Sequence, residues 1–90
     1  MKPAAGRTCL LFNPRAGSAA QLTAILDRLA ELGVEVRELG VDDDLVGLVR
    51  AAADEGFDTV AVAGGDGSVQ AGATGLATAS RRATLAVLPL

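Results

Sequence analysis

The residues with the clearest capacity for chemistry are five consecutive positions, Gly64-Gly65-Asp66-Gly67-Ser68, between an apolar run and an amphipathic stretch. Three glycines remove Cβ atoms from a turn, so backbone amides can approach a ligand and adopt positive φ without strain. A helix that starts here directs its free amides to the same place, which favours an anion such as phosphate. Asp66 would repel phosphate unless it holds a ribose hydroxyl, Mg²⁺ with its water shell, or the loop's own amides.

Two common phosphate motifs are excluded for this stretch. The dinucleotide fingerprint would need a glycine at position 70, where Gln70 stands. A P-loop would need a lysine behind its glycines, and the only lysine of the chain is Lys2. Taken alone, the five residues also fit a plain turn between strand and helix, with Asp66 as its cap.

A second loop of interest reads Asn13-Pro14-Arg15-Ala16-Gly17-Ser18 and follows the apolar run of residues 7–12. Pro14 fixes the turn, and Gly17 and Ser18 open the next amphipathic stretch with another set of free amides. Asn-Pro alone is an ordinary turn signal, and an arginine on a loop is more often solvated than bound to phosphate. The loop gains meaning only from its position relative to the glycine-rich turn.

The elements that position both loops form an α/β pattern, because short apolar runs alternate with amphipathic stretches of helical length. We expect a three-layer fold with an open parallel sheet and helices on both faces. Strands are predicted over residues 7–12, 34–39, 59–63 and 84–88, and helices over 18–33, 42–56 and 68–77. The strands at 7–12, 59–63 and 84–88 are continuously apolar at their centres, as strands buried on both faces are. Residues 34–39 alternate in polarity, which predicts an edge strand.

Each predicted helix carries one apolar face. The faces comprise Leu22, Ile25, Leu26 and Leu29 in the first helix, Leu45, Leu48, Val49 and Ala52 in the second, and Val69, Ala73 and Leu76 in the third. The small residues Ala71 to Ala73 predict close packing of the third helix. The acidic triplet Asp42 to Asp44 is expected to cap the second helix rather than to bind a metal.

The expected strand order is 2-1-3-4, because short connections and right-handed crossovers favour it. The chain then winds in opposite directions from strand one to strand two and from strand one to strand three. Ligands of open α/β sheets bind at such a switch point, beyond the carboxyl ends of the strands. We therefore predict that the loops after strands one and three lie side by side in one binding cleft.

Composition excludes several other classes. The net charge is −3, with 11 acidic and 8 basic residues, and Phe12 and Phe57 are the only aromatic residues, so nucleic acid is not an expected partner. The single cysteine, Cys9, cannot form an internal disulfide, which suits a cytoplasmic protein. Apolar runs are too short for a signal peptide or a membrane span, so membrane contact would be peripheral. Without His or Tyr, no nucleophilic triad is expected. We assign no catalytic or metal-ligating residue.

Together, Asn13-Pro14-x-Ala16-Gly17 and Gly64-Gly65-Asp66-Gly67-Ser68 resemble the paired motifs of the diacylglycerol kinase and sphingosine kinase catalytic domain. The resemblance extends to Leu88-Pro89-Leu90. The Gly-Gly-Asp-Gly element is shared with NAD kinases and 6-phosphofructokinases, whereas the Asn-Pro element and the spacing favour lipid kinases. The resemblance implies a nucleotide-binding domain of the NAD kinase and diacylglycerol kinase type.

By this resemblance, residues 1–90 are the N-terminal, ATP-binding part of a lipid kinase that transfers the γ-phosphoryl group of ATP to a lipid hydroxyl such as that of diacylglycerol. ATP and Mg²⁺ are the implied ligands. The implied nucleotide-binding residues are Asn13, Gly17, Ser18, Gly64, Gly65, Asp66, Gly67, Ser68 and Gln70. Family members often have Thr where Ser68 stands, Asn-Glu at Gln70 and Ala71, and Thr at Gly40.

Family members continue with a Gly-Thr-x-Asn-Asp stretch and a β-rich second domain that supplies the lipid-facing surface and the general base. We therefore expect the 90-residue chain alone to have no useful kinase turnover. An NAD kinase or sugar-phosphate kinase is the alternative enzyme, and a nucleotide-binding module or a remnant without catalysis is the alternative outside enzymes. A fourth strand at an open edge would also permit association between copies.

Overall fold

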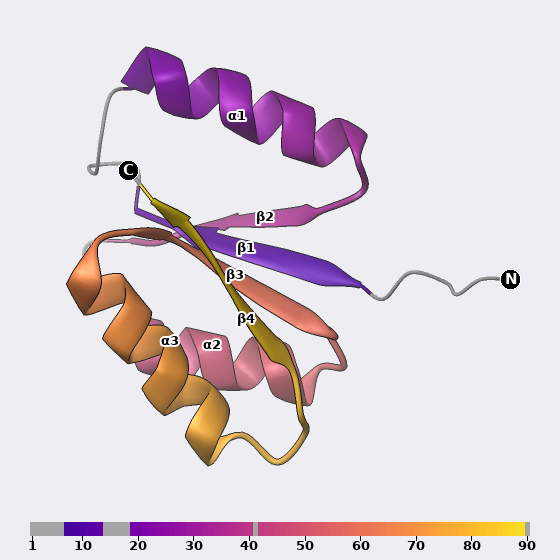
Figure 1. The fold of residues 1–90 in the computed structure, drawn as a ribbon, viewed down its shortest axis with the longest axis vertical. Helices are drawn as coiled ribbons and strands as arrows, with labels where there is room; N and C mark the ends of the chain where they lie inside the picture. The colour runs from indigo at the N-terminus through magenta and orange to yellow at the C-terminus, as the bar shows by residue number, and fades with distance from the viewer. Residues whose placement is uncertain (1–6, 14–18, 41, 90) are drawn as a thin grey trace, which may run out of the picture.

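A computed structural model describes residues 7–13, 19–40 and 42–89 (Figure 1). Along the chain the elements are β1 (Thr8–Phe12), α1 (Ala19–Glu31), β2 (Glu35–Glu38), α2 (Leu45–Asp54), β3 (Thr59–Gly64), α3 (Asp66–Thr78) and β4 (Thr84–Pro89). The strands form one parallel sheet in the order β2-β1-β3-β4, which confirms the predicted order. Helix α1 covers one face, and α2 and α3 cover the other, so the predicted three layers are also confirmed (Figure 1).

The core lies on both sides of β1 and β3. Side chains of β1 alternate between the two faces: Cys9 and Leu11 join the cluster beneath α2, and Leu10 and Phe12 join the cluster beneath α1. All four are at most 6% exposed. Leu45, Leu48, Val49 and Ala52 pack in the first cluster as expected. From the predicted face of α1, Leu26 and Leu29 pack in the second cluster and Ile25 is half-buried, while the Leu22 side chain lies outside the described part. Burial on both faces explains the continuous apolar run of β1.

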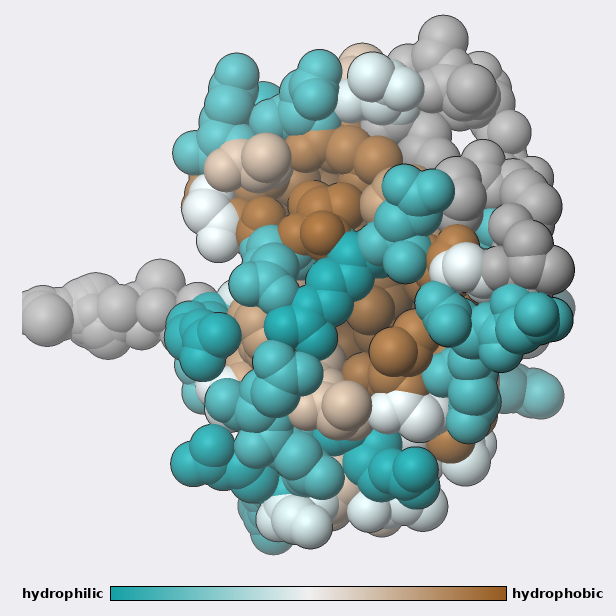
Figure 2. Space-filling model, turned by 180° about the vertical axis from the view of Figure 1, so that it is seen from behind, coloured by the Kyte–Doolittle hydropathy of each residue, from teal (hydrophilic) through white to brown (hydrophobic). Residues whose placement is uncertain are grey.

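Strand β2 forms a polar edge, as its alternating sequence predicts. Glu35 and Glu38 are exposed, whereas Val36 and Arg37 are half-buried. Seen from behind, a hydrophilic band crosses the surface between two hydrophobic areas (Figure 2). Charged side chains on an edge strand discourage pairing with the edge of another molecule.

Strand β4 departs from the prediction that it is buried on both faces. Val87 is 44% exposed, and Leu85, Ala86 and Leu88 are only half-buried. An apolar hollow of about 220 Å³ lies on this part of the sheet, lined mainly by β1, β3, β4 and the end of α1. Helix α1 covers β1 and β2 on one face of the sheet and leaves β4 partly uncovered. In addition, within the described ranges β4 pairs only with β3.

Helix α3 buries the predicted face only in part, because Leu76 packs against the cluster beneath α2 as expected but Ala73 does not. Ala73 is exposed, and the buried positions of the helix are Gly72 and Gly75. A Cβ atom at Gly75 would lie 2.7 Å from the carbonyl oxygen of Val46 in α2 and 2.7 Å from the Cβ of Val49. The close contact with α2 is therefore made at Gly75, whereas Gly72 faces Val62 and Leu85 of the sheet, and an apolar periodicity detects neither glycine.

A cluster of charged side chains surrounds Phe57, which lies just before the amino end of β3. Arg37 donates two hydrogen bonds to the Glu55 carboxylate, at 2.9 and 2.8 Å, and one to Glu35 at 2.6 Å. The guanidinium carbons of Arg7 and Arg37 lie 4.2 and 5.2 Å from the centre of the Phe57 ring. The hydrogen bonds from Arg37 lower the pKa of the Glu55 carboxyl.

We expect this pair to make stability depend on pH. A carboxyl whose pKa is lowered in the folded state stabilises the fold above its unfolded pKa, about 4.3, and this contribution is lost as the pH falls through the folded value. Urea unfolding of the wild type and Glu55→Gln should therefore differ at pH 7 and converge towards pH 3. Glu31→Gln is the matched control, because Glu31 makes only a single exposed ion pair, 3.5 Å from Arg28. A difference that is the same at every pH would contradict the assignment.

Candidate functional site

The two predicted loops begin side by side at the carboxyl ends of the strands. Strands β1 and β3 are hydrogen-bonded neighbours, and Phe12 is paired with Ala63. The residues that follow, Asn13 and Gly64, therefore leave adjacent parallel strands in the same direction. No strand intervenes, and the start of α3 lies at this same end of the sheet (Figure 1). The rest of the first loop, including Gly17 and Ser18, lies outside the described residues.

Gly64 allows the sharp turn from β3 into α3. Its φ is +150°, a value that L side chains rarely adopt. A Cβ atom at this position would also collide with the side chain of Ser68. The glycine is thus required for both its conformation and its lack of a side chain, and it brings the start of α3 against the end of the strand.

Helix α3 begins at Asp66, two residues earlier than predicted, because Gly65 is its extended N-cap. The amides of Ser68 and Val69 donate to the Gly65 carbonyl at 3.0 and 3.2 Å. The preceding amides, those of Asp66 and Gly67, have no carbonyl acceptor within the helix, as is general for the first turn. The N-cap residue Gly65 has no side chain that could cap this end. Two N–H groups and the positive end of the helix dipole therefore face the turn.

The turn is open to a ligand. Gly65, Asp66 and Gly67 are exposed and Ser68 is half-buried, while Gln70 is exposed in the next turn of the helix. Apart from chain neighbours and the backbone of α3 itself, no atom of residues 7–13, 19–40 and 42–89 lies within 4 Å of the position that a Cβ atom would occupy at Gly65 or Gly67. This bare backbone beside free helix amides fits a phosphate group. Asp66 adds one carboxylate, and proteins commonly hold Mg²⁺ through one or two carboxylates together with phosphate oxygens.

The acidic triplet serves the backbone. The Asp43 carboxylate accepts a hydrogen bond of 2.7 Å from the Gly40 amide, directly after β2, and Asp44 is the N-cap of α2, accepting from Val46 at 3.1 Å. In the ranges 7–13, 19–40 and 42–89, no three His, Cys, Asp or Glu side chains gather as metal ligands would. The expectation that the triplet caps the helix is thus confirmed for Asp44.

Sequence reasoning did not include the end of β4 in the site. Gly64 is paired with Pro89 in the sheet, so the carboxyl end of β4 lies beside the glycine turn. The loop between β2 and α2 begins with Leu39 and Gly40 at the same end of the sheet, because the Leu39 amide donates a 2.8 Å hydrogen bond to the Phe12 carbonyl. The predicted strand order could have shown that the end of β4 lies beside the glycine turn, since the carboxyl ends of all parallel strands lie at the same end of the sheet.

Comparisons with known proteins agree with this geometry. A family model described as the diacylglycerol kinase catalytic domain matches residues 7–90. A diacylglycerol kinase structure from Bacillus anthracis strain Sterne is 29% identical, with a TM-score of 0.79, over 98% of this chain and 34% of that chain. A second structure from the same organism, described as a candidate diacylglycerol kinase, is 30% identical, with a TM-score of 0.80, over 99% and 32%.

The chain thus spans about a third of the length of these solved relatives. Among curated proteins, no significant match was found. Across the part of the chain that the structure describes, no helix combines the length and the apolar character needed to cross a membrane.

Proposed function

The chain belongs to the diacylglycerol kinase catalytic domain family, and from this premise we propose that it forms the ATP-binding part of a lipid kinase. The observation that carries the proposal is the pairing of β1 with β3, which places the Asn13 and Gly64 turns at one switch point of the sheet. Open α/β sheets bind ligands at this position. The free amides at the start of α3 give the position a preference for phosphate.

The chain's own residues would bind and orient the phosphates of ATP. The amides of Asp66 and Gly67 donate to phosphate oxygens, and the bare backbone of Gly65 lets the nucleotide approach closely. We also assign nucleotide binding to Asn13, Gly17, Ser18, Gly64, Ser68 and Gln70, as the family motifs imply. Asp66 would hold Mg²⁺, directly or through its water shell, and Mg²⁺ when bound would offset the negative charge of the phosphates.

The proposed reaction transfers the γ-phosphoryl group to a lipid hydroxyl such as that of diacylglycerol. Phosphoryl transfer depends mainly on positioning and on electrostatic stabilisation, and these are the contributions we assign to residues 1–90. We assign removal of the proton from the acceptor hydroxyl to a part of the family domain outside these residues. The 90-residue chain alone is therefore expected to bind ATP without useful turnover.

Isothermal titration calorimetry tests the proposal, because one substitution should change the affinity for ATP in opposite directions with and without Mg²⁺. With Mg²⁺ present, Asp66→Ala should weaken ATP binding about tenfold, because a hydrogen bond or metal contact to a charged group is lost. With EDTA in place of Mg²⁺, the same substitution should strengthen binding, since the Asp66 carboxylate then only repels the phosphates.

Asp27→Ala is the matched control, because Asp27 is an exposed carboxylate in the second half of α1, towards the end of the sheet opposite the glycine turn. It should leave ATP binding unchanged in both conditions. Absence of heat from the folded wild type with ATP and Mg²⁺ would refute the proposal and favour a domain that does not bind nucleotide.

A further inference from the structure

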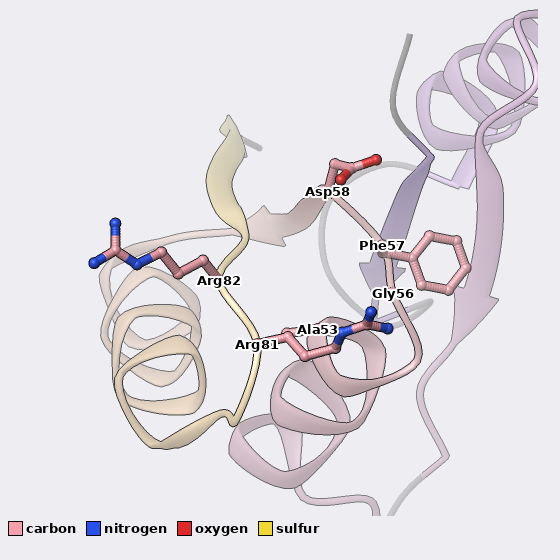
Figure 3. A pocket seen from close by; sticks show the side chains of 6 residues that line it. All are labelled: Ala53, Gly56, Phe57, Asp58, Arg81 and Arg82. Carbon is pink, nitrogen blue, oxygen red and sulfur yellow. The ribbon is translucent and has the colours of Figure 1, made fainter. Parts of the chain in front are cut away.

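A pocket of about 360 Å³ lies at the end of the sheet opposite the glycine turn (Figure 3). It opens between the loop that joins α2 to β3 and the loop that joins α3 to β4. Its walls are formed by Ala53, Gly56, Phe57, Asp58, Arg81 and Arg82. Strand β3 separates it from the proposed nucleotide site by about 20 Å, at about 3.3 Å per residue. The pocket therefore has no part in the function proposed above.

Two guanidinium groups converge at the edge of this pocket, over Gly56. Nη1 of Arg81 lies 3.0 Å, and Nη1 of Arg7 lies 3.9 Å, from the point that a Cβ atom of Gly56 would occupy. The two nitrogens are consequently no further apart than the sum of these distances. Figure 3 shows the Arg81 side chain reaching towards the Gly56 loop, while Arg82 extends in the opposite direction. Two positive charges at this separation repel each other unless an anion lies between them.

The carboxylates nearby are engaged with other groups. Asp54 accepts hydrogen bonds from the amides of Ser80 and Arg81, at 2.7 and 3.2 Å. Asp58 accepts a bond of 3.0 Å from the Arg7 amide. The third nearby acid, Glu55, is paired with Arg37, and its charge also attracts that of Arg7 without forming an ion pair. Among the residues that the structure describes, no ion pair joins the guanidinium group of Arg7, Arg81 or Arg82 to a carboxylate.

Phe57 holds one of the two guanidinium groups in place. The guanidinium carbon of Arg7 lies 4.2 Å from the centre of the Phe57 ring. A guanidinium in contact with a ring through its face keeps its N–H groups in its plane, where they can donate to an oxyanion. Less side-chain entropy is then lost when an anion binds than at a freely rotating arginine.

We propose that Arg7 and Arg81, with Arg82 at the rim, form a binding site for a phosphate group, either free or in a lipid head group. Arginine suits this ligand because its planar fork of donors matches phosphate oxygens. Asp58 in the pocket wall opposes the anion and limits its affinity. The proposal is independent of the nucleotide site, since it uses other residues at the opposite end of the sheet.

NMR titration of the ¹⁵N-labelled 90-residue chain with inorganic phosphate, at constant ionic strength with chloride, tests the site. We expect saturable shifts of the Gly56 and Arg81 amides, and about tenfold weaker binding in Arg81→Gln, because one charged hydrogen-bond donor is lost. Arg50→Gln removes the same charge from an exposed position of α2 and should have no effect. Shifts at Gly65 and Gly67 would report separately on phosphate at the glycine turn.

Asp58→Asn provides a second test, in which the affinity for phosphate should rise rather than fall. The asparagine oxygen can still accept the bond from the Arg7 amide, so the fold is retained while the repulsion is removed. Phosphate should then bind more tightly than in the wild type. Shifts at Gly56 that do not saturate, or that are equal in the wild type, Arg81→Gln and Asp58→Asn, would overturn the proposal.

Sedimentation with vesicles distinguishes the two sources of the phosphate group. Binding to phosphatidylcholine vesicles that contain phosphatidylglycerol, but not to phosphatidylcholine alone, and its loss in Arg81→Gln would assign the site to lipid head groups. Phosphate binding without vesicle binding would assign it to a free phosphate compound. Arg81→Gln should retain ATP binding in either case, so failure of this site and failure of the nucleotide site are distinguishable.

Discussion

Gly75→Ala is expected to lower the melting temperature of the chain by about 10 °C, corresponding to about 2 kcal/mol for a domain of this size. Alanine in place of glycine ordinarily stabilises a helix interior by about 1 kcal/mol. Here the added methyl group would meet the Val46 carbonyl oxygen and the Val49 Cβ, both at 2.7 Å. Neither atom can move without shifting α2, and overpacking of this kind costs about 1–3 kcal/mol and occasionally more.

Gly72→Ala is the matched control in the same helix. A Cβ atom at Gly72 would approach Cδ1 of Leu85 at 2.8 Å, but this atom is the end of a flexible, half-buried side chain that can rotate away. The gain in helix propensity should then largely offset the contact, and the melting temperature should change little. Equal melting temperatures for the two variants would contradict the close contact between α2 and α3.

The order of the strands could be predicted from the sequence because each rule acts locally. Continuous apolar runs identified the buried strand β1, and alternation in residues 34–39 identified the edge strand β2. Short connections and right-handed crossovers then left the order β2-β1-β3-β4. The same reasoning placed Asn13 and Gly64 at the same end of the sheet, because the carboxyl ends of neighbouring parallel strands lie side by side.

The features that the sequence did not predict depend on contacts between distant segments. An apolar periodicity selected Ala73 for the buried face of α3, yet Gly72 is buried against the sheet and Gly75 against α2, because the distance between packed elements is not encoded in the helix alone. Burial of β4 depends on what covers the sheet, and Val87 is exposed because α1 lies over β1 and β2.

The arginine pocket was missed for a similar reason. Arg7, Phe57 and Arg81 are separated by tens of residues in the sequence, and each of them alone is an ordinary residue at the end of an element. They meet because the amino ends of β1 and β3 are neighbours and the loop before β4 crosses the same end. The pair Arg81 and Arg82 was the only local signal, and net charge gave no indication of where the arginines gather.

Gly64→Ala should both destabilise the fold and weaken ATP binding more than tenfold. A φ of +150° at a non-glycine residue costs about 1–3 kcal/mol, and the added methyl group would also collide with Ser68. The turn can relieve both only by moving the start of α3, which displaces the amides of Asp66 and Gly67. A displacement of about 1 Å is enough to cost a large factor in a positioned site. Urea unfolding and calorimetry with ATP and Mg²⁺ measure the two effects.

A double-mutant cycle with Ser68→Ala separates the two causes. Ser68→Ala removes the Oγ atom that the new methyl group would meet, but the Ser68 Cβ still lies 3.1 Å from that position and the φ of the turn is unchanged. Gly64→Ala with Ser68→Ala should therefore recover part of the lost stability and little of the ATP affinity. Full recovery of both would mean that the collision alone matters and that the backbone tolerates alanine. No loss in Gly64→Ala itself would remove the close approach of β3 and α3 from which the proposed phosphate site is built.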